Sequence, residues 1–147
     1  MEEKENSILI VEDDEINISI LSEILGGVYE IHVARNGQEG IEKAQSLLPD
    51  LILLDIIMPG MNGYEVIKIL RSILSTQEIP IMFVTSMDKL DDERKGLMLG
   101  ATDYIHKPFD WLVVMLRVGI QMRIVNQAKT IKSLTAELES LKTDKQN

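Results

Sequence analysis

The sequence contains no cysteine, and its 24 acidic residues outnumber its 15 basic ones. Without cysteine the chain has no disulfide framework, no thiolate metal site and no thiol nucleophile. The formal net charge of −9 argues against direct binding of nucleic acid, because contacts to phosphate backbones need a basic surface. The composition therefore excludes thiol chemistry and disfavours nucleic acid as a partner.

Long hydrophobic runs are also missing. The longest apolar stretches, around residues 51–58 and 111–116, are far shorter than a membrane span. The first seven residues are acidic and polar, unlike the basic start of a signal peptide. We therefore expect a cytoplasmic protein without membrane contact, and its length fits one domain with a short appendage.

Short apolar runs alternate with longer amphipathic segments. Strands are predicted at 8–11, 30–34, 51–54, 81–84 and 104–106, and helices at about 15–25, 37–48, 64–74 and 90–99, with a fifth from about residue 110. Three of the strands are almost entirely apolar, which is typical of parallel strands covered on both faces. Five repeats of strand then helix predict an α/β sandwich around a parallel sheet. No glycine-rich nucleotide motif follows any strand.

Polar side chains follow four of the predicted strands. Glu12 and Asp13 come after the first, Asp55 after the third, Thr85 after the fourth and Lys107 after the fifth. Because parallel strands end at one edge of the sheet, these side chains are expected to meet there. Each feature has a plainer reading: the acidic run can cap a helix, and Lys107 can form a structural ion pair with Asp55. Neither reading explains why several carboxylates gather at one edge.

Crowded carboxylates repel one another unless a cation lies among them. A few carboxylates with water suit Mg²⁺ better than Ca²⁺. With Mg²⁺ bridging to phosphate oxygens, Asp55 could attack phosphorus and form an aspartyl phosphate. Thr85 and Lys107 could then each contact a phosphoryl oxygen. The pattern therefore favours phosphoryl transfer to a carboxylate.

Four segments resemble the receiver domains of two-component response regulators. They are ILIVEDD at 8–14, LLDIIMPGMNG at 53–63, VTS at 84–86 and YIHKPF at 104–109. The resemblance implies a flavodoxin-like fold, that is, a doubly wound five-stranded parallel sheet in the order 2-1-3-4-5. It also implies a signalling module without turnover of an external substrate, phosphorylated by a sensor histidine kinase or a phosphotransfer protein.

The resemblance assigns roles to individual residues. Asp55 becomes the phosphoacceptor, with Thr85 and Lys107 beside the phosphoryl group. Glu12, Asp13, Asp55 and the main-chain carbonyl of Ile57 become the Mg²⁺ site. Thr85 and Tyr104 become a switch pair that alters the face formed by the fourth helix, fifth strand and fifth helix, and the bond between residues 107 and 108 is expected to be cis.

Two apolar positions suggest a long-lived phosphoryl group. Ile57 lies two residues after Asp55, and Met87 lies two residues after Thr85. In the family these positions flank the path of the hydrolytic water, which an apolar side chain cannot orient by hydrogen bonding. The alternative is that both residues simply pack at the rim of the site.

The chain continues beyond the expected receiver domain at 1–122 into a predicted helical extension at 123–147. Residues at a and d positions of one heptad frame are mostly apolar: Ile120, Ile124, Ile131, Leu134, Leu138 and Leu141, with Arg117 and Gln127 as interruptions. We interpret the pattern as a coiled coil that makes a homodimer through the fifth helix and its extension. The alternative is a helix folded back on its own domain. Since no output domain follows, we favour a piece of a longer protein over a stand-alone receiver.

Three rival functions remain open. A Mg²⁺-dependent phosphohydrolase working through an aspartyl phosphate would need a second acid two residues after Asp55, where Ile57 stands. An interaction module that ignores phosphate would be expected to lack some of Glu12, Asp13, Thr85 and Lys107. A flavin carrier rests on the fold class alone.

Overall fold

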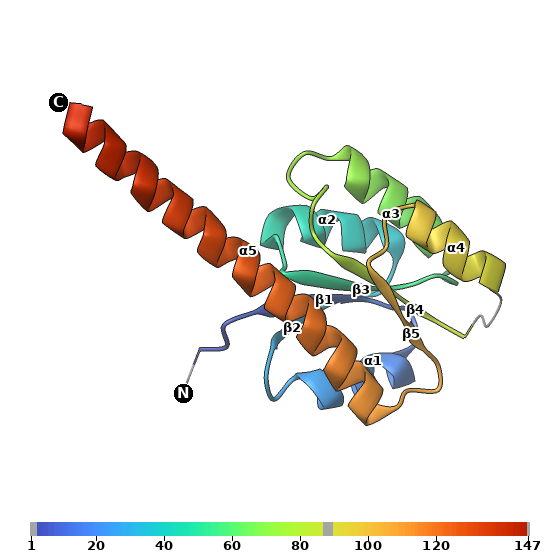
Figure 1. The fold of residues 1–147 in the computed structure, drawn as a ribbon. Coiled ribbons are helices and arrows are strands. Elements are labelled where there is room, and N and C mark those ends of the chain that lie inside the picture. Colours follow the sequence, from blue (N-terminus) through green and yellow to red (C-terminus); the bar gives the residue numbers. More distant parts are fainter. Residues whose placement is uncertain (1–2, 87–89, 147) are drawn as a thin grey trace.

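The computed structural model describes residues 3–86 and 90–146. Its elements alternate as predicted: β1 (Ser7–Val11), α1 (Glu15–Leu25), β2 (Glu30–Ala34), α2 (Gly37–Leu47), β3 (Leu51–Asp55), α3 (Gly63–Ser72), β4 (Ile81–Thr85), α4 (Leu90–Met98), β5 (Asp103–His106) and α5 (Trp111–Gln146). The five strands form one parallel sheet in the order 2-1-3-4-5 (Figure 1). The predicted fold class is confirmed.

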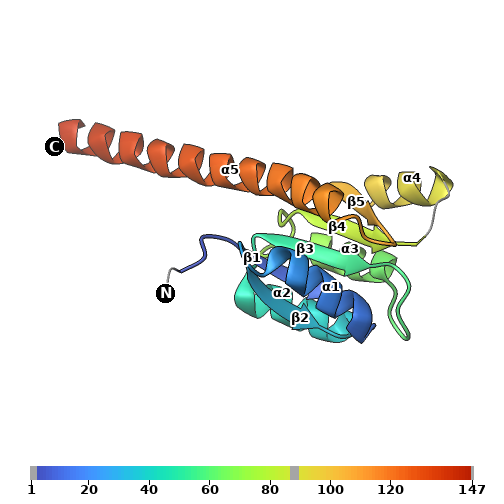
Figure 2. The ribbon, with the colours of Figure 1, turned by 90° about the horizontal axis from the view of Figure 1, so that it is seen from below.

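Helices cover both faces of the sheet. Alternate residues of β1 serve the two sides: Leu9 and Val11 belong to one apolar cluster, and Ile8 and Ile10 to the other. The first cluster packs against α2 and α3, and the second against α1 and α5 (Figures 1 and 2). Because both faces are buried, the strands are apolar throughout rather than alternating, as the sequence indicated.

The last helix, α5, is far longer than the others and continues well past the body of the domain (Figures 1 and 2). Val114, Val118 and Met122 on this helix are buried against the sheet. Lys132 still lines a surface cleft together with Asp50 and Pro80, and the end of the helix after it projects away from the domain instead of folding back on it (Figures 1 and 2). No helix in the described part of the chain is long and apolar enough to cross a membrane.

Polar contacts fasten α5 to the domain just before the helix projects. The side-chain amides of Asn6 and Asn126 donate hydrogen bonds to each other's oxygens at 2.9 and 3.2 Å. Three residues later, Lys129 forms an ion pair with Asp50 at 2.6 Å. The other carboxylate oxygen of Asp50 accepts a hydrogen bond from the backbone N–H of Ser7 at 2.9 Å. We refer to Asn6, Asn126, Asp50 and Lys129 as the helix clamp.

Candidate functional site

Three strand ends deliver charged side chains to one edge of the sheet. Asp55 is the last residue of β3, Glu12 follows β1, and Lys107 follows β5. Since Val11 pairs with Leu54 in the parallel register, Glu12 and Asp55 are the next residues along two neighbouring strands. Local strand pairing therefore sets the two carboxylates side by side.

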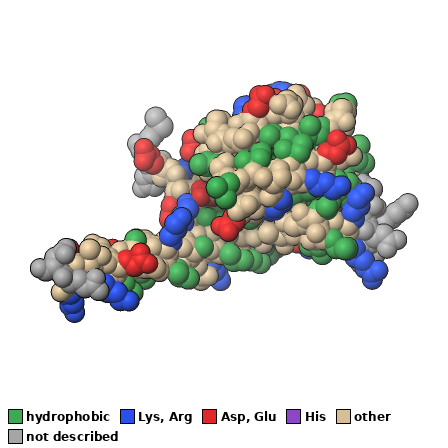
Figure 3. All heavy atoms as spheres, turned by 90° about the horizontal axis from the view of Figure 1, so that it is seen from above, with side chains coloured by type: hydrophobic (Ala, Val, Ile, Leu, Met, Phe, Trp, Pro, Cys, Tyr) green, Lys and Arg blue, Asp and Glu red, His purple; other side chains and the backbone are tan. Residues whose placement is uncertain are grey.

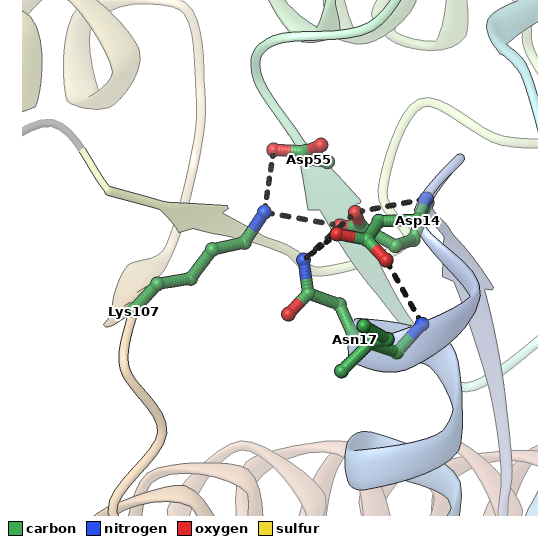
Figure 4. A network of polar contacts seen from close by, with 6 residues as sticks. Asp14, Asn17, Asp55 and Lys107 are labelled. Carbon is green, nitrogen blue, oxygen red and sulfur yellow. Dashed lines mark hydrogen bonds and ion pairs between the residues drawn. The ribbon is translucent and has the colours of Figure 1, made fainter.

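The carboxylates converge on one point. One oxygen each of Glu12, Asp13 and Asp55 lies within 4.8 Å of the others. Glu12 and Asp55 are buried, with 1% and 4% of their surface exposed, whereas Asp13 is exposed. Lys107 extends its ammonium group between the two buried acids, 3.4 Å from Asp55 Oδ1 and 3.4 Å from Glu12 Oε2 (Figure 4). One cation thus faces three acidic groups.

The electrostatics of this cluster disfavour a fully ionised state. Burial, followed by the charge of Glu12, raises the pKa of the Asp55 carboxyl to about 7, and Lys107 opposes part of this rise. In the described residues, Glu12 Oε2 is buried and accepts no hydrogen bond. An added cation would lower the repulsion and give this oxygen a ligand role. The donor set is all oxygen, so the residues fit Mg²⁺.

A shallow cleft of about 250 Å³ opens over the cluster. Its lining is mostly polar: Glu12, Asp13, Asp14, Asn17, Asp55, Ile57, Ser86 and Lys107. Asp14 caps α1 by accepting a hydrogen bond from Ile16 N–H at 2.9 Å, so the last residue of the acidic run is a helix cap, as the plainer reading of that run has it. Asn17 and Ser86 were not predicted to line the site. Asn17 donates a hydrogen bond to Glu12 Oε1 at 3.3 Å. In the sequence, Asn17 lies in the first turn of the predicted helix that follows the acidic run, and this position could have indicated that it lies near Glu12.

Thr85 and Tyr104, the two residues predicted to form a switch pair, lie outside this cleft lining. Thr85 ends β4, is 2% exposed, and its carbonyl accepts a hydrogen bond from Lys107 N–H at 2.9 Å. Tyr104 is buried on β5, and its hydroxyl donates to the Glu93 carbonyl of α4 at 2.7 Å. Ile57 is 63% exposed at the rim. Met87 lies outside the described residues.

The loop after β3 is held close to Asp55 by a glycine. Gly63 N–H donates to the Ile56 carbonyl at 2.8 Å, and a Cβ at Gly63 would lie 2.4 Å from the Asp55 backbone oxygen. Asn62 caps α3 by accepting a hydrogen bond from Glu65 N–H. The bond between Lys107 and Pro108 is cis, as the resemblance implied.

Residues 8–118 match the family described as response regulator receiver domain. This match spans the sheet from its second residue onward, helices α1 to α4, the start of α5 and every residue of the acidic cluster. The chain belongs to the response regulator receiver domain family. It is therefore the receiver domain of a two-component response regulator, a signalling module. Receiver domains bind Mg²⁺ at an acidic pocket and interact with histidine kinases or phosphotransfer proteins.

Relatives of known sequence and structure agree with this assignment. The receiver is 41% identical over 117 residues to the "Probable cyclic di-GMP phosphodiesterase" of Vibrio cholerae, covering 80% of this chain and 26% of that protein. It is 38% identical over 112 residues to the response regulator PleD of Caulobacter vibrioides, covering 76% of this chain and 25% of PleD. The chain thus spans about a quarter of the length of these relatives.

Solved structures give the same result. A response regulator structure from Chloroflexus aurantiacus superposes with a TM-score of 0.77 at 31% identity, covering 82% of this receiver and 99% of that chain. The chemotaxis protein CheY4 of Vibrio cholerae superposes with a TM-score of 0.71 at 30% identity, covering 77% and 94%.

Proposed function

We propose that Asp55 is the phosphoacceptor of this receiver and that a sensor histidine kinase or phosphotransfer protein supplies the phosphoryl group. The observation that carries the proposal is the buried Asp55 carboxylate, which opens on the cleft beside Glu12 and Lys107 (Figure 4). A carboxylate oxygen of Asp55 attacks the phosphorus of the donor phosphohistidine. The P–N bond breaks, and the histidine nitrogen keeps the electron pair and takes up a proton.

Each residue around Asp55 would make a different contact with the phosphoryl group or with Mg²⁺. Lys107, already 3.4 Å from Asp55, would shift to a phosphoryl oxygen and neutralise part of its charge. Thr85, at the end of the neighbouring strand, would turn its hydroxyl toward a second oxygen. Glu12, Asp13, Asp55 and the main-chain carbonyl of Ile57 would hold Mg²⁺, which supplies charge neutralisation and an anchor for phosphate oxygens.

Phosphorylation adds about two negative charges and three acceptor oxygens beside Thr85 and Lys107. Thr85 on β4 pairs in register with His106 on β5, and the His106 ring stacks on that of Tyr104 with centroids 6.4 Å apart. We therefore expect a shift of Thr85 to alter the position of the Tyr104 ring. Tyr104 in turn contacts α4 through Glu93. We propose that this route alters the α4-β5-α5 face by shifting a population between two packings.

We also propose that α5 and its extension form a homodimer. Val118 is buried against the sheet, whereas Ile120, two residues or about 200° further round the helix, is 57% exposed. The same outward stripe continues along the extension, where every apolar a and d residue is more than half exposed: Ile124, Ile131, Leu134, Leu138 and Leu141. Hydrophobic side chains lie among charged ones on this projecting arm (Figure 3).

The occupant that fits this stripe is a second copy of the same helix. The a and d spacing is that of a two-stranded coiled coil, and Glu137 at g and Lys142 at the next e are spaced for an interchain pair in a parallel dimer. Because the stripe faces away from the sheet, the α5 helices of two chains can pair while each helix stays packed on its own sheet. We propose that the extension, which begins near residue 123 and whose first turns the helix clamp holds to the domain, transmits the change to an output segment of a longer protein.

Phosphate uptake tests the first proposal. The full chain is incubated with acetyl phosphate and Mg²⁺, and intact mass is measured. We expect a gain of one phosphoryl group in the wild type and in Asp50→Asn, a matched aspartate at the other end of β3, and none in Asp55→Asn. Uptake by Asp55→Asn equal to that of the wild type would refute the assignment.

Sedimentation with and without beryllofluoride and Mg²⁺ tests the dimer. We expect the activated wild type to self-associate and Leu138→Glu to remain monomeric. Ser140→Glu adds the same charge on the opposite side of the helix and should associate like the wild type. A wild type that stays monomeric in both states would contradict the proposed coiled coil.

A further inference from the structure

The ring of Tyr104 lies in a closed space between the sheet and α4. Only 5% of Tyr104 is exposed, and its ring centroid lies 5.8 Å from that of Phe83 on β4. Its hydroxyl reaches α4 and donates to the Glu93 carbonyl at 2.7 Å. The ring therefore connects β5 to α4, and the position of one depends on the position of the other.

Gly96, three residues after Glu93, forms the wall of this space on α4. It is buried, and a Cβ built on it would lie 1.8 Å from the Tyr104 hydroxyl oxygen and 2.9 Å from two carbons of the Phe83 ring. Non-bonded heavy atoms do not approach to 1.8 Å, so the ring cannot keep this place if residue 96 carries any side chain. Gly119, also inside a helix, has open space around the same position.

We propose that Gly96 is the positioning residue that permits the inward place of the Tyr104 ring. Its missing side chain makes the space that the hydroxyl occupies, and the hydroxyl holds α4 through the adjacent turn. A larger residue forces one of two changes: the ring leaves the space, or α4 moves away from β5. The size of residue 96 therefore determines the position of the Tyr104 ring, and its distance from α4, in the unphosphorylated receiver.

The Glu93 side chain strengthens the same connection. Its carboxylate lies 3.1 Å from His106 Nε2, while its backbone carbonyl accepts the Tyr104 hydrogen bond. His106 lies two residues after Tyr104 on β5, and the two rings stack at 6.4 Å. One turn of α4 thus contacts two side chains of β5, and Gly96 allows the turn to approach that closely.

The test is a double-substitution cycle with Gly96→Ala, Tyr104→Phe and the pair together, in the full chain. Gly119→Ala is the matched control, since it makes the same change inside a helix where a Cβ meets nothing. All variants are labelled with fluorotyrosine, which gives one signal for each of the three tyrosines. The signal of Tyr104 is assigned by its loss in Tyr104→Phe, and Tyr29, on the other face of the sheet, is the internal reference.

We expect Gly96→Ala to move the Tyr104 signal toward that of a solvent-exposed ring and to lower the urea midpoint. Gly119→Ala should leave the signal in place and keep or raise the midpoint, because alanine is the better helix former. Since the nearest clashing atom is the hydroxyl oxygen, adding Tyr104→Phe to Gly96→Ala should recover much of the lost midpoint. If Gly96→Ala does not fold, recovery of folding in the pair carries the same information.

An unmoved Tyr104 signal in Gly96→Ala would overturn the proposal. So would a pair no more stable than Gly96→Ala alone, because the hydroxyl would then not be what the new methyl group meets. These measurements use neither phosphate nor Mg²⁺, so they stand apart from the phosphoacceptor assignment. The link to signalling rests on the proposed function: if the packing result holds, Gly96→Ala should also change the beryllofluoride concentration needed for association.

Discussion

The helix clamp makes a quantitative prediction about where the receiver body ends. In a chain shortened to residues 1–132, substituting both Asn126→Ala and Lys129→Ala removes the contacts to Asn6 and Asp50 without shortening the helix. The two amide hydrogen bonds are worth about 0.5–1.5 kcal/mol each, and loss of Asn126 leaves the buried Asn6 without those two bonds. The ion pair adds only about 0.2–1 kcal/mol, because Lys129 is 56% exposed.

Together these contacts predict a loss of about 2–3 kcal/mol. Urea unfolding of the 1–132 chain measures this loss, and with a slope of about 1–3 kcal/mol per molar the midpoint should fall by roughly 0.7–3 M. A chain cut to 1–122 should lose at least as much, since it lacks the same contacts and ends beside buried Met122. A doubly substituted chain within about 0.5 kcal/mol of its parent would refute the clamp.

Three further predictions concern single sites. Burial raises the pKa of Asp50, but hydrogen bonds from Lys129, Ser7 N–H and Asn6 outweigh burial and leave the pKa below its usual value of 3.8. The ionised carboxylate therefore stabilises the fold, and in urea unfolding at pH 7 Asp50→Asn should be less stable than the wild type. This difference in stability should disappear as the pH falls below 3.8 and the carboxylate of the wild type is protonated. Gly63→Ala should cost about 2 kcal/mol or more, because its Cβ meets the Asp55 backbone, while Gly27→Ala, in open space, should not. Ile57→Asn with Met87→Glu should shorten the phosphoryl lifetime measured by intact mass; an unchanged lifetime would exclude water orientation at these positions.

Much of the fold could be predicted because both sheet faces are covered. Buried parallel strands must be apolar along their whole length, so β1, β3 and β4 are visible as short runs, and the polar residue after each run marks the strand end. Parallel pairing then brings Glu12 and Asp55 together by register alone. The cluster was therefore visible from local patterns plus one rule of topology.

Contacts between distant segments were not visible in the same way. The amides of Asn6 and Asn126 are 120 residues apart, and neither residue is unusual in its local pattern. Gly96 looks like an ordinary helix interruption until Tyr104 is placed against it. The heptad pattern indicated an apolar stripe on the last helix, but only packing shows that the stripe lies opposite the face that covers the sheet.

The location of the phosphoryl group is the most direct test of the acidic cluster. Protein treated with acetyl phosphate and Mg²⁺ is reduced with borohydride, which converts an aspartyl phosphate to homoserine, and the peptides are mapped by mass. The account predicts homoserine at Asp55 alone and its loss when Mg²⁺ is chelated beforehand. Homoserine at Asp13 or Asp14 instead, or equal labelling without the metal, would contradict it.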